Sequence, residues 1–146
     1  MSLNPETTLA EIVADYAETF GWSAQEAADV LLLAEEARAG FAHVPRAPSP
    51  GERGVRVYVM RDARGYVKVG ISNAPLARIR ELSAGNPEGL ELVFQTLEYS
   101  RAYALAVEAA VHHDLAAFRK GREWFDCTAG RAMQAIYLMG AEGDIP

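Results

Sequence analysis

The first third of the chain has hydrophobic residues at helical spacing. Apolar side chains recur every three or four positions from Leu9 to Phe20, directly after a Thr-Leu-Ala-Glu sequence that is typical of a helix N-terminal capping box. A second capping box begins at Ser23 and opens another amphipathic segment, which we expect to end near Gly40. The two segments predict a helical hairpin within residues 1–42.

The hydrophobic period changes to two after a stretch that is rich in proline. Residues 43–54 contain three prolines and show no periodicity, which is typical of an extended linker. Valines then alternate with other residues in two runs, 55–60 and 66–71, which predict a β-hairpin. If both rows of valines face the core, odd-numbered residues pair with odd-numbered residues, and Tyr58 and Lys68 share the opposite face.

The rest of the chain alternates between helical and strand patterns. The expected elements are a helix with Pro75 in its first turn, a third strand over residues 90–98, a long helix over residues 101–118 and a final helix over residues 129–139. Together with the β-hairpin they predict an α/β (α+β) domain over residues 55–146. In this domain, helices flank a small three-stranded antiparallel sheet.

Composition excludes several classes of protein. Half of the 146 residues are hydrophobic, which is enough for a packed core. The longest apolar run falls far short of the roughly 18 residues that span a bilayer, and no secretory signal is recognisable. The single cysteine, Cys127, excludes an intrachain disulfide framework and a cysteine-rich zinc site. We therefore expect a cytoplasmic protein without membrane contact.

The charge is distributed unevenly along the chain. The net charge is −6, and the first 50 residues carry eight carboxylates against two arginines. Residues 53–80, in contrast, carry seven basic side chains and one acidic side chain. This segment predicts a basic surface suited to a polyanion such as DNA. The acidic hairpin would then be an interaction or regulatory segment, which shields the basic surface, forms a homodimer through its apolar face or binds a protein partner.

Several short motifs follow one another in a fixed order after residue 55. They are Tyr58-Val59, Lys68-Val69-Gly70, Arg78, Asn86-Pro87, Glu108 with His112, and the run from Gly121 to Phe125. In this order the chain resembles, over about residues 55 to 127, the GIY-YIG nuclease superfamily. The resemblance is closest to the compact branch named from a T5-phage reading frame and a meiotically up-regulated yeast gene. Arg56 stands where the first motif has glycine, and Lys68 where the second has tyrosine.

The resemblance implies a DNA endonuclease that depends on a divalent metal ion, Mg²⁺ or Mn²⁺. It implies Tyr58 as the general base, Arg78 as the phosphate clamp, Glu108 as the metal ligand and Lys68 as an auxiliary cation. The chemistry of these side chains agrees, because phosphodiester hydrolysis needs an activated water and positive charge on the phosphoryl oxygens. We expect Lys68 to lower the pKa of Tyr58 below its usual value of about 10, so that the phenolate can act as a base.

Four further positions are candidates for substrate contacts, and each has a structural alternative. Tyr66 lies on the Tyr58 face and can supply a second phenol or pack there. Gly70 permits a phosphate to approach the backbone closely, or simply ends a strand. His112, one turn after Glu108, can order that carboxylate, contact phosphate or be a structural histidine. Arg80 can contact phosphate or be a solvated charge.

Two functions other than an endonuclease remain open at this stage. The domain can be a nucleic-acid-binding module without turnover, because a basic surface alone is sufficient for binding. It can also be the scaffold of an interaction or regulatory protein in which the acidic hairpin is the functional part.

Overall fold

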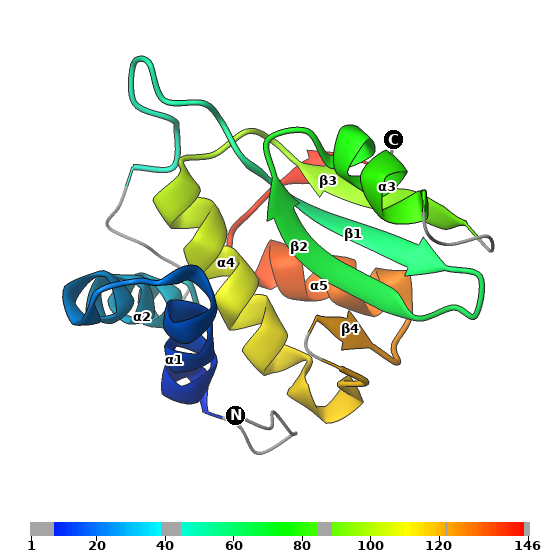
Figure 1. The fold of residues 1–146 in the computed structure, drawn as a ribbon, viewed down its shortest axis with the longest axis horizontal. Helices are drawn as coiled ribbons and strands as arrows, with labels where there is room; N and C mark the ends of the chain where they lie inside the picture. The colour runs from blue at the N-terminus through cyan, green and yellow to red at the C-terminus, as the bar shows by residue number, and fades with distance from the viewer. Residues whose placement is uncertain (1–7, 39–44, 85–88, 122, 145–146) are drawn as a thin grey trace.

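The computed structural model describes residues 8–38, 45–84, 89–121 and 123–144. The elements in chain order are α1 (Leu9–Phe20), α2 (Ala24–Arg38), β1 (Arg56–Asp62), β2 (Val67–Ser72), α3 (Pro75–Ser83), β3 (Leu90–Thr96), α4 (Arg101–Asp114), a 3-10 turn (Ala116–Phe118), β4 (Trp124–Phe125), α5 (Ala129–Leu138) and β5 (Gly143–Asp144). Helix α4 crosses the middle of the molecule, with α1 and α2 on one side of it and the sheet on the other (Figure 1).

Within the described residues the sheet has five strands where the sequence predicts three, so that prediction is wrong in number although the α+β class holds. The strands are antiparallel and lie in the order β4-β2-β1-β3-β5. The two additional strands, β4 and β5, lie at the edges and are two residues long each. Such short strands cannot show an alternating pattern, so only their pairing with β2 and β3 reveals them.

The register of the β-hairpin is the predicted one. Val59 pairs with Val69 and Tyr58 pairs with Gly70, so odd residues face odd residues. The odd-numbered valines pack into the main core with α4 and α5. The even-numbered side chains Tyr58 and Met60 form a second, smaller core with Ile79 of α3 on the other face of the sheet.

The predicted helical hairpin is present, and its apolar face is buried within the chain. Its helices start at the predicted capping boxes, where the hydroxyls of Thr8 and Ser23 accept hydrogen bonds from backbone N–H groups. Buried side chains of α1 and α2 pack against two alanines of α4, Ala106 and Ala109. The face that we considered for homodimerisation is therefore covered by α4. The predicted end near Gly40 lies outside the described residues.

The described part of the predicted linker is bonded to the start of α4. The backbone oxygen of Arg46 accepts a hydrogen bond from the N–H of Ser100 at 2.7 Å. The Glu52 carboxylate accepts another from the N–H of Arg101 at 2.9 Å. These bonds satisfy N–H groups at a helix N-terminus, which have no partner inside the helix. The division of the chain at residues 43–54 remains a prediction.

The long helix is shorter than its hydrophobic pattern predicts. Helix α4 ends at Asp114, and the 3-10 turn that follows leaves Phe118 37% exposed instead of in the core. Val111 and Leu115 are buried, as expected. Among the described helices, none combines the length and the apolar character needed to cross a membrane.

Candidate active site

A cleft of about 230 Å³ opens beside β2, with residues of β1, β2, α3 and α4 in its lining. Helix α3 borders it on one side and helix α4 on the other. It is lined by Tyr58, Lys68, Gly70, Ile71, Arg78, Arg101, Leu105, Glu108 and Glu123. The structure therefore brings together five predicted site residues that are up to 50 positions apart in the sequence: Tyr58, Lys68, Gly70, Arg78 and Glu108.

Tyr58 and Gly70 form one unit across the β-hairpin. They are paired directly in the register of β1 and β2, and the tyrosine ring lies across the glycine. A methyl group at position 70 would lie 2.6 Å from the Tyr58 hydroxyl oxygen and 2.7 Å from the ring carbon that carries it. Gly70 is therefore needed to let the ring lie over β2 and direct its hydroxyl into the cleft.

The pKa of Tyr58 is raised, so the predicted lowering is wrong. Burial of the phenol is the main cause, and the negative charges of Glu123 and Glu108 add to it, whereas Arg78 acts in the opposite direction. Lys68 does not offset these effects because its ammonium group is paired with Glu123, with 3.1 Å between Nζ and Oε2. Tyr58 therefore keeps its proton at neutral pH.

Glu108 is a buried carboxylate at the wall of the cleft. It is only 5% exposed, and its Oε1 accepts a hydrogen bond from the Tyr16 hydroxyl at 3.0 Å. Burial, followed by repulsion from Glu123, raises the pKa of Glu108 to about 8, although the hydrogen bond from Tyr16 and the charge of Lys68 oppose this. Glu108 therefore keeps its proton at neutral pH in the metal-free cleft.

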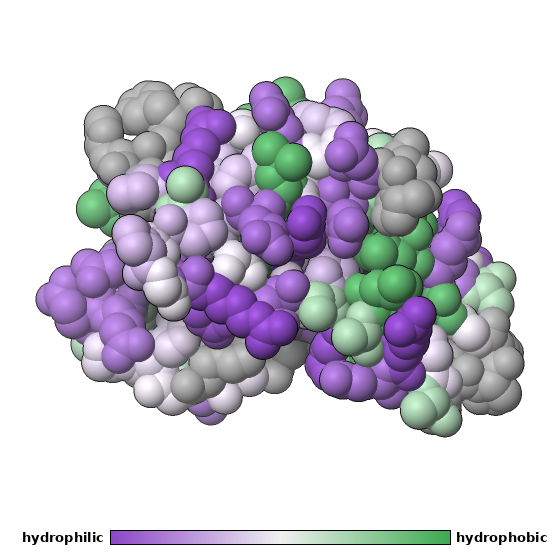
Figure 2. Space-filling model, turned by 90° about the horizontal axis from the view of Figure 1, so that it is seen from above, coloured by the Kyte–Doolittle hydropathy of each residue, from purple (hydrophilic) through white to green (hydrophobic). Residues whose placement is uncertain are grey.

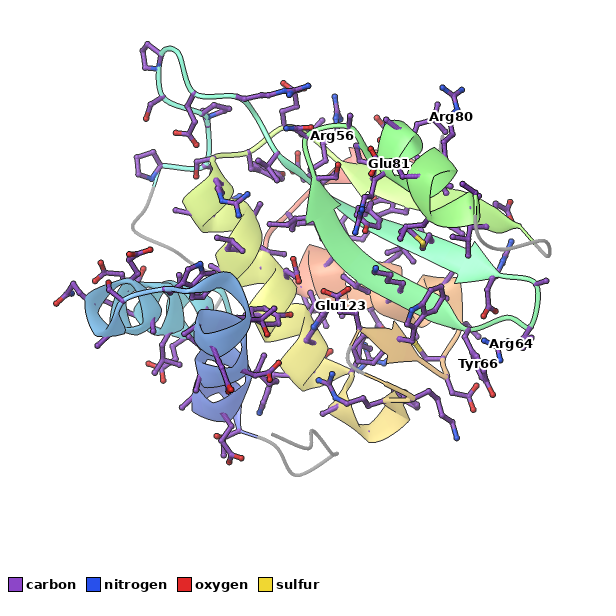
Figure 3. The ribbon with its side chains drawn as sticks, viewed as in Figure 1. Arg56, Arg64, Tyr66, Arg80, Glu81 and Glu123 are labelled. Atoms are coloured by element: carbon purple, nitrogen blue, oxygen red, sulfur yellow. The ribbon has the colours of Figure 1, made fainter. Side chains whose placement is uncertain are left out.

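Glu123 precedes β4 and lies between α4 and β2 (Figure 3). The carboxylate of Glu123 forms an ion pair with the ammonium group of Lys68. The Lys68 side chain is 11% exposed, so this ion pair is shielded from water more than a surface pair would be. The pairing holds the ammonium group at the cleft instead of extending it into solvent.

Arg78 and Arg80 differ in position although both lie on α3 and both are exposed. Arg78 lines the cleft, and its Nη1 lies 3.3 Å from Oε2 of Glu81, one helical turn away. The side chain of Arg80 points away from the sheet and does not line the cleft (Figure 3). Of the two arginines, only Arg78 is placed to bind a phosphate in this cleft.

Tyr66 and His112 also lie outside the cleft lining. Tyr66 precedes β2 at the far end of the β-hairpin, where the Arg64 guanidinium lies 4.9 Å from the centre of its ring (Figure 3). His112 is buried behind Glu108, and its Nε2 lies 2.7 Å from the backbone oxygen of Val69. Burial lowers the pKa of His112 to about 4, so its imidazole is neutral at pH 7.

Part of the positive charge of the basic segment is paired with carboxylates in the structure. Arg56, Arg61 and Arg64 are paired with Glu98, Glu91 and Asp62, respectively. The face of the molecule seen from above is mostly hydrophilic, with a hydrophobic area toward one end (Figure 2). The cations at the cleft itself are Lys68, Arg78 and Arg101.

Comparison with known families identifies the domain that carries the cleft. Residues 55–140, more than half of the chain, match the T5orf172 domain. The chain belongs to the T5orf172 domain family. Neither a curated protein nor a solved structure matches the chain. The T5orf172 domain contains all the cleft-lining residues, and the predicted resemblance is confirmed for the branch named from the T5-phage reading frame.

Sequence reasoning missed two residues, one inside the T5orf172 domain and one outside it. Arg101 precedes Leu105 by four positions and Glu108 by seven, so the three share one face of α4 and line the cleft together. That spacing could have revealed Arg101. Tyr16 fits the apolar stripe of α1, and nothing in the sequence indicates that its hydroxyl contacts a residue 92 positions away.

Replacing Gly70 by alanine is expected to displace the Tyr58 ring. The new methyl group would overlap the ring, so we expect a loss of about 1–3 kcal/mol in the free energy of unfolding, measured in urea. Gly121→Ala is the matched control, because a side chain at position 121 meets no atom within 4 Å. Equal losses in the two variants would contradict the proposed overlap.

The stability of the metal-free protein is expected to fall as pH rises toward 8. The folded state holds the Glu108 proton up to about pH 8, whereas the unfolded chain releases it near 4.5. Because the unfolded chain binds fewer protons over this range, the free energy of unfolding decreases with pH. The variant Glu108→Gln has no titrating group at this position. Between about pH 5 and pH 8, the free energy of unfolding of the wild type should therefore fall by on the order of 3 kcal/mol relative to that of the variant.

Urea unfolding in EDTA at several pH values measures this difference. Glu91→Gln is the control, because Glu91 is exposed and paired with Arg61 away from the cleft. That variant should keep the pH dependence of the wild type. If the free energy of unfolding changed with pH in the same way for wild type and Glu108→Gln, Glu108 would titrate as an ordinary carboxyl group.

Proposed function

We propose that the T5orf172 domain of this chain is a divalent-metal-dependent DNA endonuclease of the GIY-YIG type. The observation that carries the proposal is that three groups from different elements line one cleft. They are the phenol of Tyr58, the carboxylate of Glu108 and the guanidinium of Arg78. These are the groups that the GIY-YIG resemblance assigns to phosphodiester cleavage. Membership of the T5orf172 family, which is nuclease-like, supports the same function.

The cationic side chains are placed to bind a DNA phosphate between α3 and α4. The planar guanidinium of Arg78 can donate two parallel hydrogen bonds to phosphoryl oxygens. Arg101 lines the opposite wall of the cleft and can contact a neighbouring phosphate of the DNA backbone. Lys68, held by Glu123, is the auxiliary cation and neutralises charge that develops on the phosphoryl group.

Tyr58 acts on the attacking water as a neutral phenol in this proposal. Its pKa is raised, so the hydroxyl is protonated and can orient a water molecule by hydrogen bonding. This role replaces the phenolate base expected from the sequence. Orientation of the water toward the phosphorus atom lowers the entropic cost of the attack.

A divalent cation fits the donor set of the cleft. The carboxylates of Glu108 and Glu123 both line it, and hard cations such as Mg²⁺ and Mn²⁺ bind carboxylate oxygens. Glu108 would hold the ion, which when bound supplies positive charge to the phosphoryl oxygens and the leaving oxygen. Within the described parts of the chain, no three His, Cys, Asp or Glu side chains form a complete metal site, so water and phosphate oxygens would complete the coordination.

Incubation with supercoiled plasmid DNA tests the proposal. The full-length protein should convert the plasmid to nicked or linear forms in Mg²⁺ or Mn²⁺ and should leave it intact in EDTA. If the plasmid stays supercoiled while a labelled duplex binds, the domain is a nucleic-acid-binding module without turnover. If it neither cleaves nor binds DNA, an interaction or regulatory role remains.

A further inference from the structure

A buried tyrosine of the helical hairpin reaches the candidate active site from outside the T5orf172 domain. The hydroxyl of Tyr16, on α1, donates a hydrogen bond to Oε1 of Glu108 at 3.0 Å. The same hydroxyl lies 2.5 Å from Nδ1 of His112, one helical turn further along α4. The T5orf172 match starts only at residue 55, so it does not include this tyrosine.

The hydrogen bonds continue from α4 into the sheet. A carbonyl oxygen only accepts, so Nε2 of His112 carries the hydrogen in its contact with Val69. Nδ1 of the neutral ring is then an acceptor, so it competes with Glu108 for the single proton of the Tyr16 hydroxyl. Val69 lies on β2 between Lys68 and Gly70, both of which line the cleft. A continuous set of contacts thus joins α1, α4 and β2 behind the site.

The position of the Tyr16 hydroxyl is fixed by the packing of its ring. The side chain is 2% exposed, and the ring meets Trp22 and His112 edge-on, with centroid distances of 6.3 and 5.9 Å. Helix α1 buries Ile12 and Val13 in the same cluster. A hydroxyl held in this way restricts the orientation of the Glu108 carboxylate that accepts from it.

We propose that Tyr16 is a positioning residue of the site, whose hydroxyl holds the Glu108 carboxylate in the orientation that binds a divalent cation. Carboxylates that hold metal ions are themselves hydrogen-bonded, and loss of such a partner costs about 10- to 100-fold in metal affinity. The hairpin thereby supplies a part of the site instead of forming a separate appendage. This inference rests on the proposed function, because it takes Glu108 as the metal ligand.

The variant Tyr16→Phe tests the inference, because it keeps the packed ring and removes the hydroxyl. Binding of Mn²⁺ alone to the full-length protein is measured by the electron paramagnetic resonance signal of the free ion. We expect the Kd for Mn²⁺ to rise about tenfold or more in Tyr16→Phe. Tyr103→Phe is the matched control, because Tyr103 is buried on α4 but donates to the Met139 oxygen away from the cleft, and its Kd should equal that of the wild type.

The outcomes separate this inference from the proposed endonuclease activity. A raised Kd in Tyr16→Phe supports the positioning role even if the plasmid is never cleaved. An unchanged Kd, or a wild-type protein that does not bind Mn²⁺, overturns the positioning role even if DNA is cleaved.

A second measurement needs only the wild-type protein, in case Tyr16→Phe fails to fold. Saturation with Mg²⁺ should shift the nuclear magnetic resonance signals of the Tyr16 ring, because its hydroxyl contacts the carboxylate that binds the ion. The signals of Tyr103 should stay in place. Tyr16 signals that remain unchanged at saturating Mg²⁺ overturn the positioning role.

Discussion

Glu108→Gln is expected to abolish plasmid nicking, with a fall in rate of about 10³-fold or more at saturating Mg²⁺. Glutamine has nearly the same shape as glutamate, and its amide oxygen can still accept the hydrogen bond from Tyr16. The substitution therefore removes the carboxylate that would be ionised when the cation is bound, and it leaves the packing intact. Initial rates of nicking of supercoiled plasmid measure the effect.

Two controls make this result specific to the carboxylate. Fluorescence anisotropy with a labelled duplex should give a DNA affinity within about threefold of the wild type, because Arg78 and Arg101 remain. Glu91→Gln, a charge change of the same kind at an exposed ion pair with Arg61, should nick at the wild-type rate. A nicking rate close to wild type in Glu108→Gln would exclude Glu108 as the metal ligand.

Arg78→Ala is expected to lower the nicking rate by on the order of 10²-fold, whereas Arg80→Ala should change it little. The two arginines are two residues apart on the same exposed helix, but only Arg78 lines the cleft. Each substitution removes one positive charge, so non-specific attraction to DNA decreases equally in the two variants. The difference between their nicking rates therefore measures the contact in the cleft.

Arg78→Lys separates charge from geometry at this position. Lysine keeps the positive charge but cannot make two parallel hydrogen bonds to a phosphate, so we expect it to restore only a small part of the lost rate. Full restoration by lysine would mean that Arg78 acts through its charge alone. Equal losses in Arg78→Ala and Arg80→Ala would mean that the cleft is not where the phosphate binds.

Ion pairs of the sheet arginines reduce the positive surface that is available to DNA. The basic segment suggests a large positive surface, but Arg56, Arg61 and Arg64 each face a carboxylate. Affinity for DNA should then depend on the few cations at the cleft, Lys68, Arg78 and Arg101. We therefore expect DNA binding by the proposed endonuclease to depend more on these cleft cations than on the paired arginines.

Local patterns were sufficient to predict most of the fold. The capping boxes placed the starts of α1 and α2, because such caps involve residues only three positions apart. The alternation of valines determined the parity of the β1 and β2 register, because a slip of one residue would expose a whole row of them. That parity alone put Tyr58 and Lys68 on one face of the sheet.

The features that local patterns did not predict depend on contacts between distant parts of the chain. Strands β4 and β5 are too short to show a period and exist through their pairing with β2 and β3. The direction of the Tyr58 pKa shift was wrong because the sequence does not reveal that Glu123 pairs with Lys68 or that the phenol is buried.

The sequence by itself determined the helices, the core strands, their register and the ordered set of candidate residues, because each follows from spacing along the chain. Only the tertiary structure decided which candidates meet: it placed Tyr58, Lys68, Gly70, Arg78 and Glu108 at one cleft and left the other three outside its lining. It also brought Tyr16 of the hairpin onto Glu108. The physical reason is that burial and hydrogen bonding between distant elements depend on how the helices and strands pack together, which no local pattern records.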